Sequence, residues 1–140
     1  MELIELSYWG LFLAAFLAAT ILPFSSEVIF TSMLISGFQP ELCLIIATLG
    51  NSFGGLTNYI IGYQGNLNWL LKLGMSPQKM ENFKKTTSLY GHWLGLLAWL
   101  PFIGDPLTIA LGYFRVAFVP FLLLMILGKF ARYFVIYAFL

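Results

Sequence analysis

Apolar residues fill this chain in long runs, separated by a few short breaks that contain proline and polar residues. The first run extends from Leu6 to Phe24, and the second, after a break at 23–27, extends from Val28 to Phe38. The second run has only about 11 residues, whereas a helix needs about 20 to cross the hydrocarbon core of a bilayer. The two runs therefore predict a helical hairpin that enters the membrane and returns.

The same order of runs occurs again in the second half. The stretch 42–63 is about 22 residues long, enough for one crossing, and it contains several polar residues. After a more polar stretch come two short apolar runs, 92–102 and 107–114, with a break at 101–106 between them. A last run, 117–140, is again long enough to cross the membrane.

The stretch 64–91 is the only one with the composition of a soluble segment, and it contains more than half of the lysines and arginines. Ser76 and Pro77 predict an N-cap followed by proline at the first helical position. Met80, Phe83 and Leu89 predict an apolar stripe, which favours an amphipathic helix on the membrane surface. A solvated connector is the alternative.

The two halves correspond when the sequence is shifted by 78 residues. The matches fall mainly at the breaks between runs, where each half needs the same backbone chemistry. Matching positions are Leu22-Pro23-Phe24 with Leu100-Pro101-Phe102, Glu27 with Asp105, Leu49-Gly50 with Leu127-Gly128, and Tyr59 with Tyr137. We interpret this pattern as an internal duplication.

These patterns together predict an all-α, polytopic membrane protein with one membrane domain, residues 1–140. Repeat unit one is expected at about 6–63, the amphipathic linker at 64–91 and unit two at about 92–140. Each unit would contain one re-entrant helical hairpin and one transmembrane helix, so it crosses once and the second unit is inverted. Inverted repeats with broken helices are typical of transporters. The lysine-rich linker is expected on the cytoplasmic side.

Composition narrows the class of protein further. Of the 140 residues, 60% are hydrophobic and 9% are charged, against roughly 25% charged in soluble domains. One histidine and one cysteine cannot form a usual zinc site, and we expect no metal, cofactor or nucleic-acid partner. The stretch 50–54 matches the G-x-S-x-G pattern of hydrolases, but it lies inside a helical run and not at a strand-to-helix turn. We therefore do not expect an enzyme.

Glu27 and Asp105 are the first candidate functional pair. Each lies shortly after a proline break, at equivalent positions of the two halves. A carboxylate inside a membrane is unfavourable and usually functional, and burial raises its pKa so that it can exchange a proton near neutral pH. Helix capping is the alternative role.

Arg115, Lys129 and Arg132 form a complementary basic set. Lys129 and Arg132 are three residues apart, on one face of the last helix. Arginine binds phosphate through its planar fork, so this set predicts an anion site. The alternatives are internal pairing with the two acidic residues, or extension of the side chains to the membrane surface.

Small residues, prolines and amides at the breaks and on the first spanning run form a third group. Asparagines and glycines of this kind hydrogen-bond between helices and let them approach closely. We expect helix packing as their main role and cavity lining as a second one. The group contains Pro23, Gly50, Asn51, Gly54, Asn58, Pro101 and Gly104.

Several motifs resemble the DedA family, also called SNARE-associated Golgi or VTT-domain proteins, and most closely its short YqaA-like branch. They cover most of the chain in the family's order. They are Leu22-Pro23-Phe24-Ser25-Ser26-Glu27-Val28, Gly50-Asn51-Ser52-Phe53-Gly54-Gly55-Leu56-Thr57-Asn58, Trp99-Leu100-Pro101-Phe102-Ile103-Gly104-Asp105, Leu111-Gly112-Tyr113-Phe114-Arg115 and Leu127-Gly128-Lys129-Phe130-Ala131-Arg132-Tyr133.

The resemblance implies two opposed re-entrant hairpins and a role in moving lipids across the bilayer, in some members linked to protons. It maps the family's functional acids onto Glu27 and Asp105, and its basic residues onto Arg115 and Arg132. The chain departs from larger members, which carry a fuller acidic cluster before the first hairpin.

We therefore expect a lipid flippase or scramblase of a bacterial inner membrane. Its substrate would be an anionic head group, of a phospholipid or a polyprenyl phosphate. The small size of the chain also suggests a homo-oligomer, in which a second copy completes the cavity. A proton-coupled carrier of a small ion or solute, and an assembly factor without transport, are the alternative functions.

Overall fold

The computed structural model describes residues 2–20, 26–65, 68, 76–99 and 104–140, and within these ranges the chain is helical, without a β-strand. The predicted all-α class is therefore confirmed for this part of the chain. The elements, in order, are α1 (Glu2–Thr20), α2 (Ser26–Ile35), α3 (Pro40–Tyr63), α5 (Pro77–Tyr90), the 3₁₀ helix η1 (Gly91–Trp99), α6 (Gly104–Tyr113) and α7 (Phe118–Ala138).

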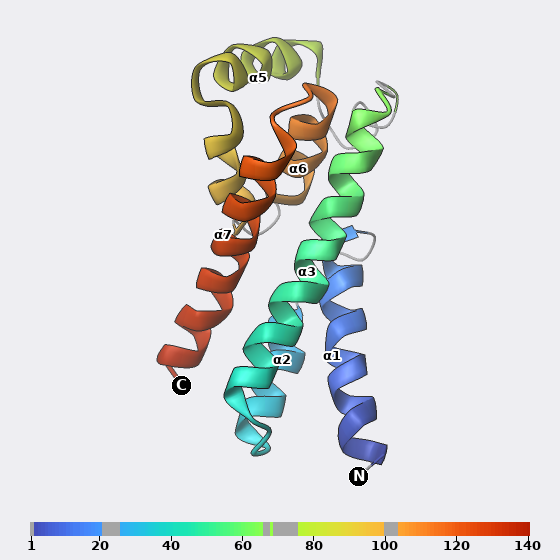
Figure 1. Ribbon diagram of the computed structural model, residues 1–140, viewed down its shortest axis with the longest axis vertical. Coiled ribbons are helices and arrows are strands. Elements are labelled where there is room, and N and C mark those ends of the chain that lie inside the picture. The colour runs from blue at the N-terminus through green and yellow to red at the C-terminus, as the bar shows by residue number, and fades with distance from the viewer. Residues whose placement is uncertain (1, 21–25, 66–67, 69–75, 100–103) are drawn as a thin grey trace.

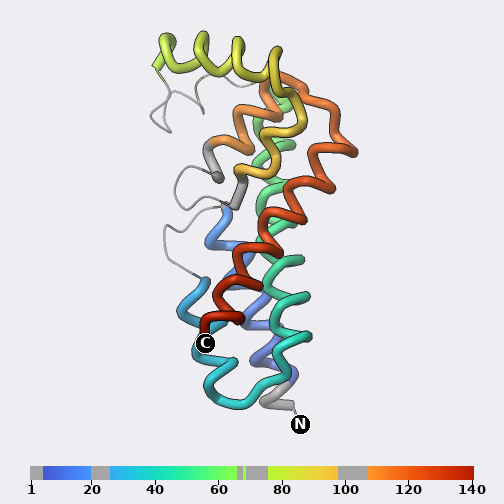
Figure 2. Tube along the Cα trace, turned by 90° about the vertical axis from the view of Figure 1, so that its left-hand side faces the viewer, coloured from blue at the N-terminus to red at the C-terminus, as the bar shows by residue number. Residues whose placement is uncertain are grey.

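The helices form an elongated bundle around α3 (Figure 1). α3 packs on α1, α6 and α7, and to a smaller extent on α2. α5 lies across one end of the bundle, roughly at right angles to its long axis (Figures 1 and 2). The charged helix thus lies at an end of the apolar bundle, where a membrane surface would be.

Two helices in the described part are long and apolar enough to cross a membrane, namely α3 with 24 residues and α7 with 21. At 1.5 Å per residue they extend about 36 and 32 Å, against about 30 Å for the hydrocarbon core. α2 and α6 have 10 residues each, or about 15 Å, which is half of that thickness. The runs predicted to be too short for a crossing are therefore short helices, whereas re-entry into the membrane stays a prediction.

The two short helices end in turns of the same backbone structure. The amide N–H of Gly37 donates to the carbonyl of Leu34 at 3.2 Å, and Arg115 donates to Gly112 at 3.0 Å, 78 residues later. Gly37 and Arg115 also both have a positive φ, of 94° and 54°. The α2–α3 and α6–α7 turns therefore correspond at the offset found in the sequence.

The apolar core is divided into two main clusters. One contains Tyr59, Leu94, Leu107, Leu111, Val116, Phe121 and Met125, and the other contains Leu11, Phe30, Met33, Cys43, Leu44, Ala47 and Tyr133. Members of the two clusters also correspond at the offset of 78, for example Met33 with Leu111 and Cys43 with Phe121. Each cluster therefore fills an equivalent position around one of the two turns.

Glycines allow the backbones of neighbouring helices to touch. A Cβ atom on Gly50 of α3 would overlap the carbonyl oxygen of Phe12 in α1. At the equivalent position of α7, a Cβ atom on Gly128 would lie 2.8 Å from the carbonyl oxygen of Leu96 in η1. Each long helix thus uses the same glycine position to approach the preceding helical segment of its own half.

α5 begins and ends where the sequence predicts. The Ser76 side chain accepts a hydrogen bond from the backbone N–H of Lys79 at 3.2 Å, Pro77 is the first helical residue, and Gly91 ends the helix at φ 55°. Met80 is buried, but Leu89 is 78% exposed, so the predicted stripe was wrong for Leu89. Leu89 is nine residues after Met80, or about two and a half helical turns, so it lies on the opposite face of α5.

The nine residues of η1 form a 3₁₀ helix, which the apolar run 92–102 did not predict. Such helices rarely exceed three or four residues, because their hydrogen-bond geometry is poorer than in an α-helix. η1 packs mainly on α7, and its backbone lies directly against Gly128. The close approach to α7 is a tertiary contact, and single-sequence periodicity does not report it.

Candidate functional site

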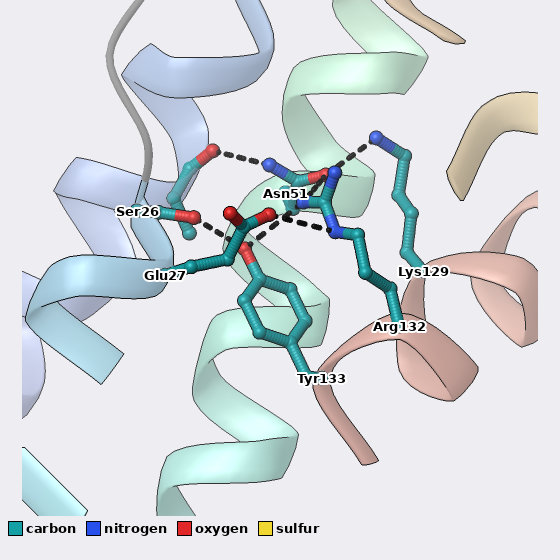
Figure 3. A network of polar contacts seen from close by, with 7 residues as sticks. Ser26, Glu27, Asn51, Lys129, Arg132 and Tyr133 are labelled. Atoms are coloured by element: carbon teal, nitrogen blue, oxygen red, sulfur yellow. Dashed lines mark hydrogen bonds and ion pairs between the residues drawn. The ribbon is translucent and has the colours of Figure 1, made fainter. Parts of the chain in front are cut away.

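A network of polar side chains lies inside the bundle, where α2, α3 and α7 meet (Figure 3). α2 begins there and contributes its first two residues, α3 contributes one side chain, and α7 contributes three. The members are Ser26, Glu27, Asn51, Lys129, Arg132 and Tyr133. The rest of these helices is mainly apolar, so the network is an isolated polar region within a hydrophobic bundle.

Asn51 is the centre of the network. Its Oδ1 atom accepts from the Lys129 Nζ atom at 2.6 Å and from the Arg132 Nη2 atom at 3.3 Å. Its Nδ2 atom donates to the carbonyl oxygen of Ala15 in α1 at 2.8 Å. Because the amide oxygen faces two donors and the amide nitrogen faces an acceptor, the Asn51 side chain has one favourable orientation. It joins α1 to the two cations of α7.

Glu27 and Arg132 form an ion pair, with 3.4 Å between the Oε1 and Nε atoms. Their side chains are 34% and 17% exposed, so this pair lies at the accessible edge of the network. The Tyr133 hydroxyl lies 2.5 Å from the Ser26 hydroxyl and accepts from the Arg132 Nη2 atom at 3.4 Å. The guanidinium is therefore held by three neighbours, the carboxylate, the amide and the phenol.

Lys129 is completely buried and Asn51 is 2% exposed. Transfer of an ammonium group from water to a medium of low dielectric is very unfavourable unless hydrogen bonds compensate for lost hydration. The short bond to Asn51 supplies part of that compensation. A lysine in this position is expensive for stability, which makes a role beyond packing the better explanation.

The Lys129–Asn51 contact has a further property, because the two residues are 78 positions apart. They are therefore equivalent positions of the two sequence halves, in direct contact with each other. α3 and α7 therefore contact each other here at positions that correspond at the offset of 78.

The structure separates the three basic residues that we grouped as one set. Lys129 and Arg132 lie together, but the Arg115 guanidinium lies 4.5 Å from the ring centre of Tyr63. Arg115 precedes α7, whereas Arg132 is 14 residues beyond its start at Phe118, or about 21 Å along the helix. The sequence shows which cations lie on one helix, but the turn before α7 directs Arg115 to the other end.

The structure describes some of the remaining predicted site residues and leaves others outside the described ranges. Pro23 and Pro101 lie outside the described residues, and Gly104 and Asp105 are the first two residues of α6, with the Asp105 side chain outside the description. Gly54 and Asn58 are buried on α3. The Asn58 Nδ2 atom donates to the carbonyl of Ala19 in the last turn of α1 at 2.7 Å, where a helix leaves carbonyls without partners.

Sequence reasoning missed Tyr133 and underestimated Ser26 and Asn51. Tyr133 follows Arg132 directly, and its polar hydroxyl inside an apolar run was the available signal. For Asn51 the signal was the offset itself, which aligns this residue with Lys129. In the described residues no group of three or more histidine, cysteine or acidic side chains comes together as a metal site.

Comparison with known proteins places the chain in a family. The VTT domain matches residues 22–140. The inner membrane protein YqaA of Escherichia coli (strain K12) is 40% identical over 129 residues, which cover 91% of this chain and 87% of that protein. An uncharacterized protein of Haemophilus influenzae is 39% identical over 133 residues, covering 88% of this chain and 80% of its own length.

A more distant relative, an uncharacterized protein of Rickettsia prowazekii, is 27% identical over 129 residues, covering 91% of this chain and 92% of its own length. No solved structure matches the chain significantly. The apolar spanning helices agree with the description of the Escherichia coli relative as an inner membrane protein. The chain is a membrane protein and belongs to the DedA/VTT family.

Proposed function

We propose that this protein moves the head group of an anionic lipid across the bacterial inner membrane. The observation that carries the proposal is the network of Glu27, Lys129 and Arg132, three ionisable side chains within one hydrogen-bonded group inside an apolar bundle. Ionisable groups at membrane depth are rare and usually belong to a pathway for ions or polar groups. No enzyme activity is part of the proposal.

The proposed architecture is a multi-pass inverted repeat. Figure 2 supports it, since α1–α2 and η1–α6 approach the middle of the long axis from opposite ends. The matching turns at Gly37 and Arg115 support it as well. Each half then supplies one broken helical pair and one spanning helix, and the broken ends meet at mid-depth, as in transporters with such repeats.

The ion pair at the edge of the network suggests how a head group is held. The Glu27 Oε1 atom lies 3.4 Å from the Arg132 Nε atom, and both side chains are partly exposed. A phosphate group presents more oxygen atoms and more negative charge than one carboxylate, and it can bind a guanidinium through two hydrogen bonds. A lipid phosphate therefore competes with Glu27 for Arg132, while the hydrocarbon chains stay in the bilayer.

The competition between Glu27 and a lipid phosphate for Arg132 also gives Glu27 a role in coupling lipid movement to protons. When Glu27 is ionised it occupies Arg132, and when it takes up a proton the attraction is removed. Proton binding thus favours head-group binding, and release of the proton expels the head group. Asp105, at the equivalent position of the second half, would act from the opposite pair of helices.

The test uses purified protein in liposomes that contain a fluorescent phosphatidylglycerol or a fluorescent polyprenyl phosphate. The fraction of lipid accessible to an external quencher is followed with and without a pH gradient. Wild type is compared with Glu27→Gln and with Glu41→Gln, an exposed acid in the first turn of α3 that serves as the matched control.

We expect wild type and Glu41→Gln to move lipid and Glu27→Gln to lose the response to the pH gradient. Equal behaviour of all three proteins would remove Glu27 from the mechanism. No movement of either lipid by folded protein would contradict lipid transport, and uptake of a small solute by the same vesicles would then establish the alternative carrier.

A further inference from the structure

The Tyr133 hydroxyl lies between the two helices that form the Glu27–Arg132 ion pair (Figure 3). It accepts from the Nη2 atom of Arg132 at 3.4 Å, and it lies 2.5 Å from the hydroxyl of Ser26, the residue before Glu27. A hydroxyl group can accept and donate hydrogen bonds at the same time. The phenol of α7 therefore connects the guanidinium with the first turn of α2.

Packing fixes the position of this phenol. Tyr133 is completely buried, and so is Phe30, whose ring centre lies 5.1 Å from that of Tyr133. Both rings belong to the apolar cluster that also contains Met33. The Arg132 guanidinium carbon lies 5.1 Å from the centre of the Tyr133 ring. The hydroxyl is thus carried by a ring that close packing prevents from turning away.

The ion pair differs from the phenol contact in its exposure and in the atom of Arg132 that it uses. Glu27 faces the Nε atom, and both side chains of the pair are partly exposed, whereas Tyr133 binds Nη2 from the buried side. A guanidinium has five N–H donors in a rigid plane. The Nε side can therefore change its partner while Nη2 stays bound to the phenol.

Asn51 is the other acceptor that the structure shows for Nη2, at 3.3 Å. The same amide oxygen accepts from Lys129 at 2.6 Å, so Arg132 shares this acceptor with a second cation. The Tyr133 oxygen is shared with a neutral hydroxyl instead, that of Ser26. Substitution of Tyr133 therefore tests the contacts of Arg132 without removing the partner of Lys129.

We propose that Tyr133 is a positioning residue for Arg132, which keeps the guanidinium in place while Glu27 and a lipid phosphate exchange at its Nε side. A long side chain that must be ordered at each binding event loses conformational entropy, and a side chain that is already ordered does not. The inference rests on the proposed lipid transport. It adds a residue that acts on the head group only through Arg132.

Three variants in the liposome assay with fluorescent phosphatidylglycerol test this role. Tyr133→Phe removes the acceptor of Arg132, and Ser26→Ala is the matched control, because it removes the other half of the hydroxyl pair and leaves the Tyr133 oxygen. Each single variant leaves one buried hydroxyl without its partner in the pair, so both should lower the thermal midpoint. The double variant removes both hydroxyls and should recover most of that loss.

Lipid movement should follow the Tyr133 hydroxyl and not the thermal midpoint. We expect movement near wild type in Ser26→Ala, about fivefold lower in Tyr133→Phe, and equally low in the double variant. Fivefold is the effect of an average hydrogen bond, in keeping with a long contact of 3.4 Å. Movement that recovers with stability in the double variant, or wild-type movement in Tyr133→Phe, would overturn the proposal. Loss of movement in Arg132→Gln beside either result would leave the proposed function intact.

A second measurement does not depend on lipid movement. The chain has two arginines, Arg115 and Arg132, so the protein with isotope-labelled arginine in detergent micelles gives guanidinium NMR signals from these two residues, and Arg115 is an internal control. We expect slow rotation of the Arg132 guanidinium in wild type and in Glu27→Gln, and fast rotation when Tyr133→Phe is added to Glu27→Gln. Fast rotation in Glu27→Gln alone, or slow rotation in that double variant, would overturn the proposal. Wild type that moves no lipid, with the expected rotation rates, would contradict the proposed function and leave Tyr133 as the residue that orders Arg132.

Discussion

The two spanning helices correspond position by position, yet their inward faces carry opposite kinds of side chain. α7 contributes the large polar groups, and α3 contributes small residues and one amide. The corresponding positions are Asn51 with Lys129, Gly54 with Arg132 and Gly55 with Tyr133. On the outer face the contrast is reversed, since Thr48 and Ser52 of α3 correspond to Ile126 and Phe130 of α7.

The glycines of α3 leave the space that the large side chains of α7 fill. A Cβ atom on Gly55 would lie 2.5 Å from the Met125 sulfur and 3.2 Å from the Lys129 Cε atom. Any larger side chain there would displace the lysine that binds Asn51. The charged site can therefore form because α3 has glycines at the positions where α7 has Arg132 and Tyr133.

The largest expected effect comes from placing the same residue at the two contacting positions, 51 and 129. Asn51→Lys brings a second ammonium against Lys129 in place of the amide oxygen that accepts from it, and removes the donor to Ala15. We expect a loss of about 3–5 kcal/mol in the free energy of unfolding, the range for an uncompensated buried charge. Unfolding of purified protein in mixed detergent micelles measures it.

The exchange Asn51→Lys with Lys129→Asn sharpens the same comparison. It restores one amide and one ammonium at the contact between α3 and α7, so most of the lost stability should return. A double variant as unstable as Asn51→Lys alone would show that the two positions are not equivalent.

A medium effect is expected at the glycines that let each long helix approach its neighbour. Gly50→Ala and Gly128→Ala both place a methyl group against a backbone carbonyl, which cannot move aside easily. We expect each to lower stability by about 1–3 kcal/mol, and Gly50→Ala to lower it more, since the contact with Phe12 is the closer one. Thermal unfolding of the two variants in parallel checks the order, and the reverse order would contradict the described packing.

The smallest expected effect concerns the two matching turns, at Gly37 and at Arg115. Gly37→Ala forces a side chain into a backbone with φ 94°, which is expected to lower stability by about 1–2 kcal/mol. Arg115→Gly relieves similar strain at φ 54° but loses the contact with Tyr63, worth about 0.5–1 kcal/mol. Its net change should be within about 1 kcal/mol, and a large loss would mean that Arg115 does more than cover Tyr63.

Much of the fold was predictable, because apolar runs and proline breaks act locally. The run lengths predicted which helices are long enough to span a membrane and which are short. Ser76, Pro77 and Gly91 marked the ends of α5 through their own backbone chemistry. The 3₁₀ form of η1 and the separation of Arg115 from Arg132 were not predictable. Both depend on how one helix packs against another, which no local pattern contains.

The most direct test of the central claim compares two arginines of this chain in the same lipid assay. Arg132→Gln removes the guanidinium from the network, and Arg115→Gln removes an equal charge near the start of α7. Loss of one charged hydrogen-bond donor to phosphate, about 1.5–3 kcal/mol, corresponds to a tenfold or greater fall in the rate. We predict that fall for Arg132→Gln with a phosphate-bearing lipid, and a near wild-type rate for Arg115→Gln. Equal rates in both variants would contradict a role for the network in moving the head group.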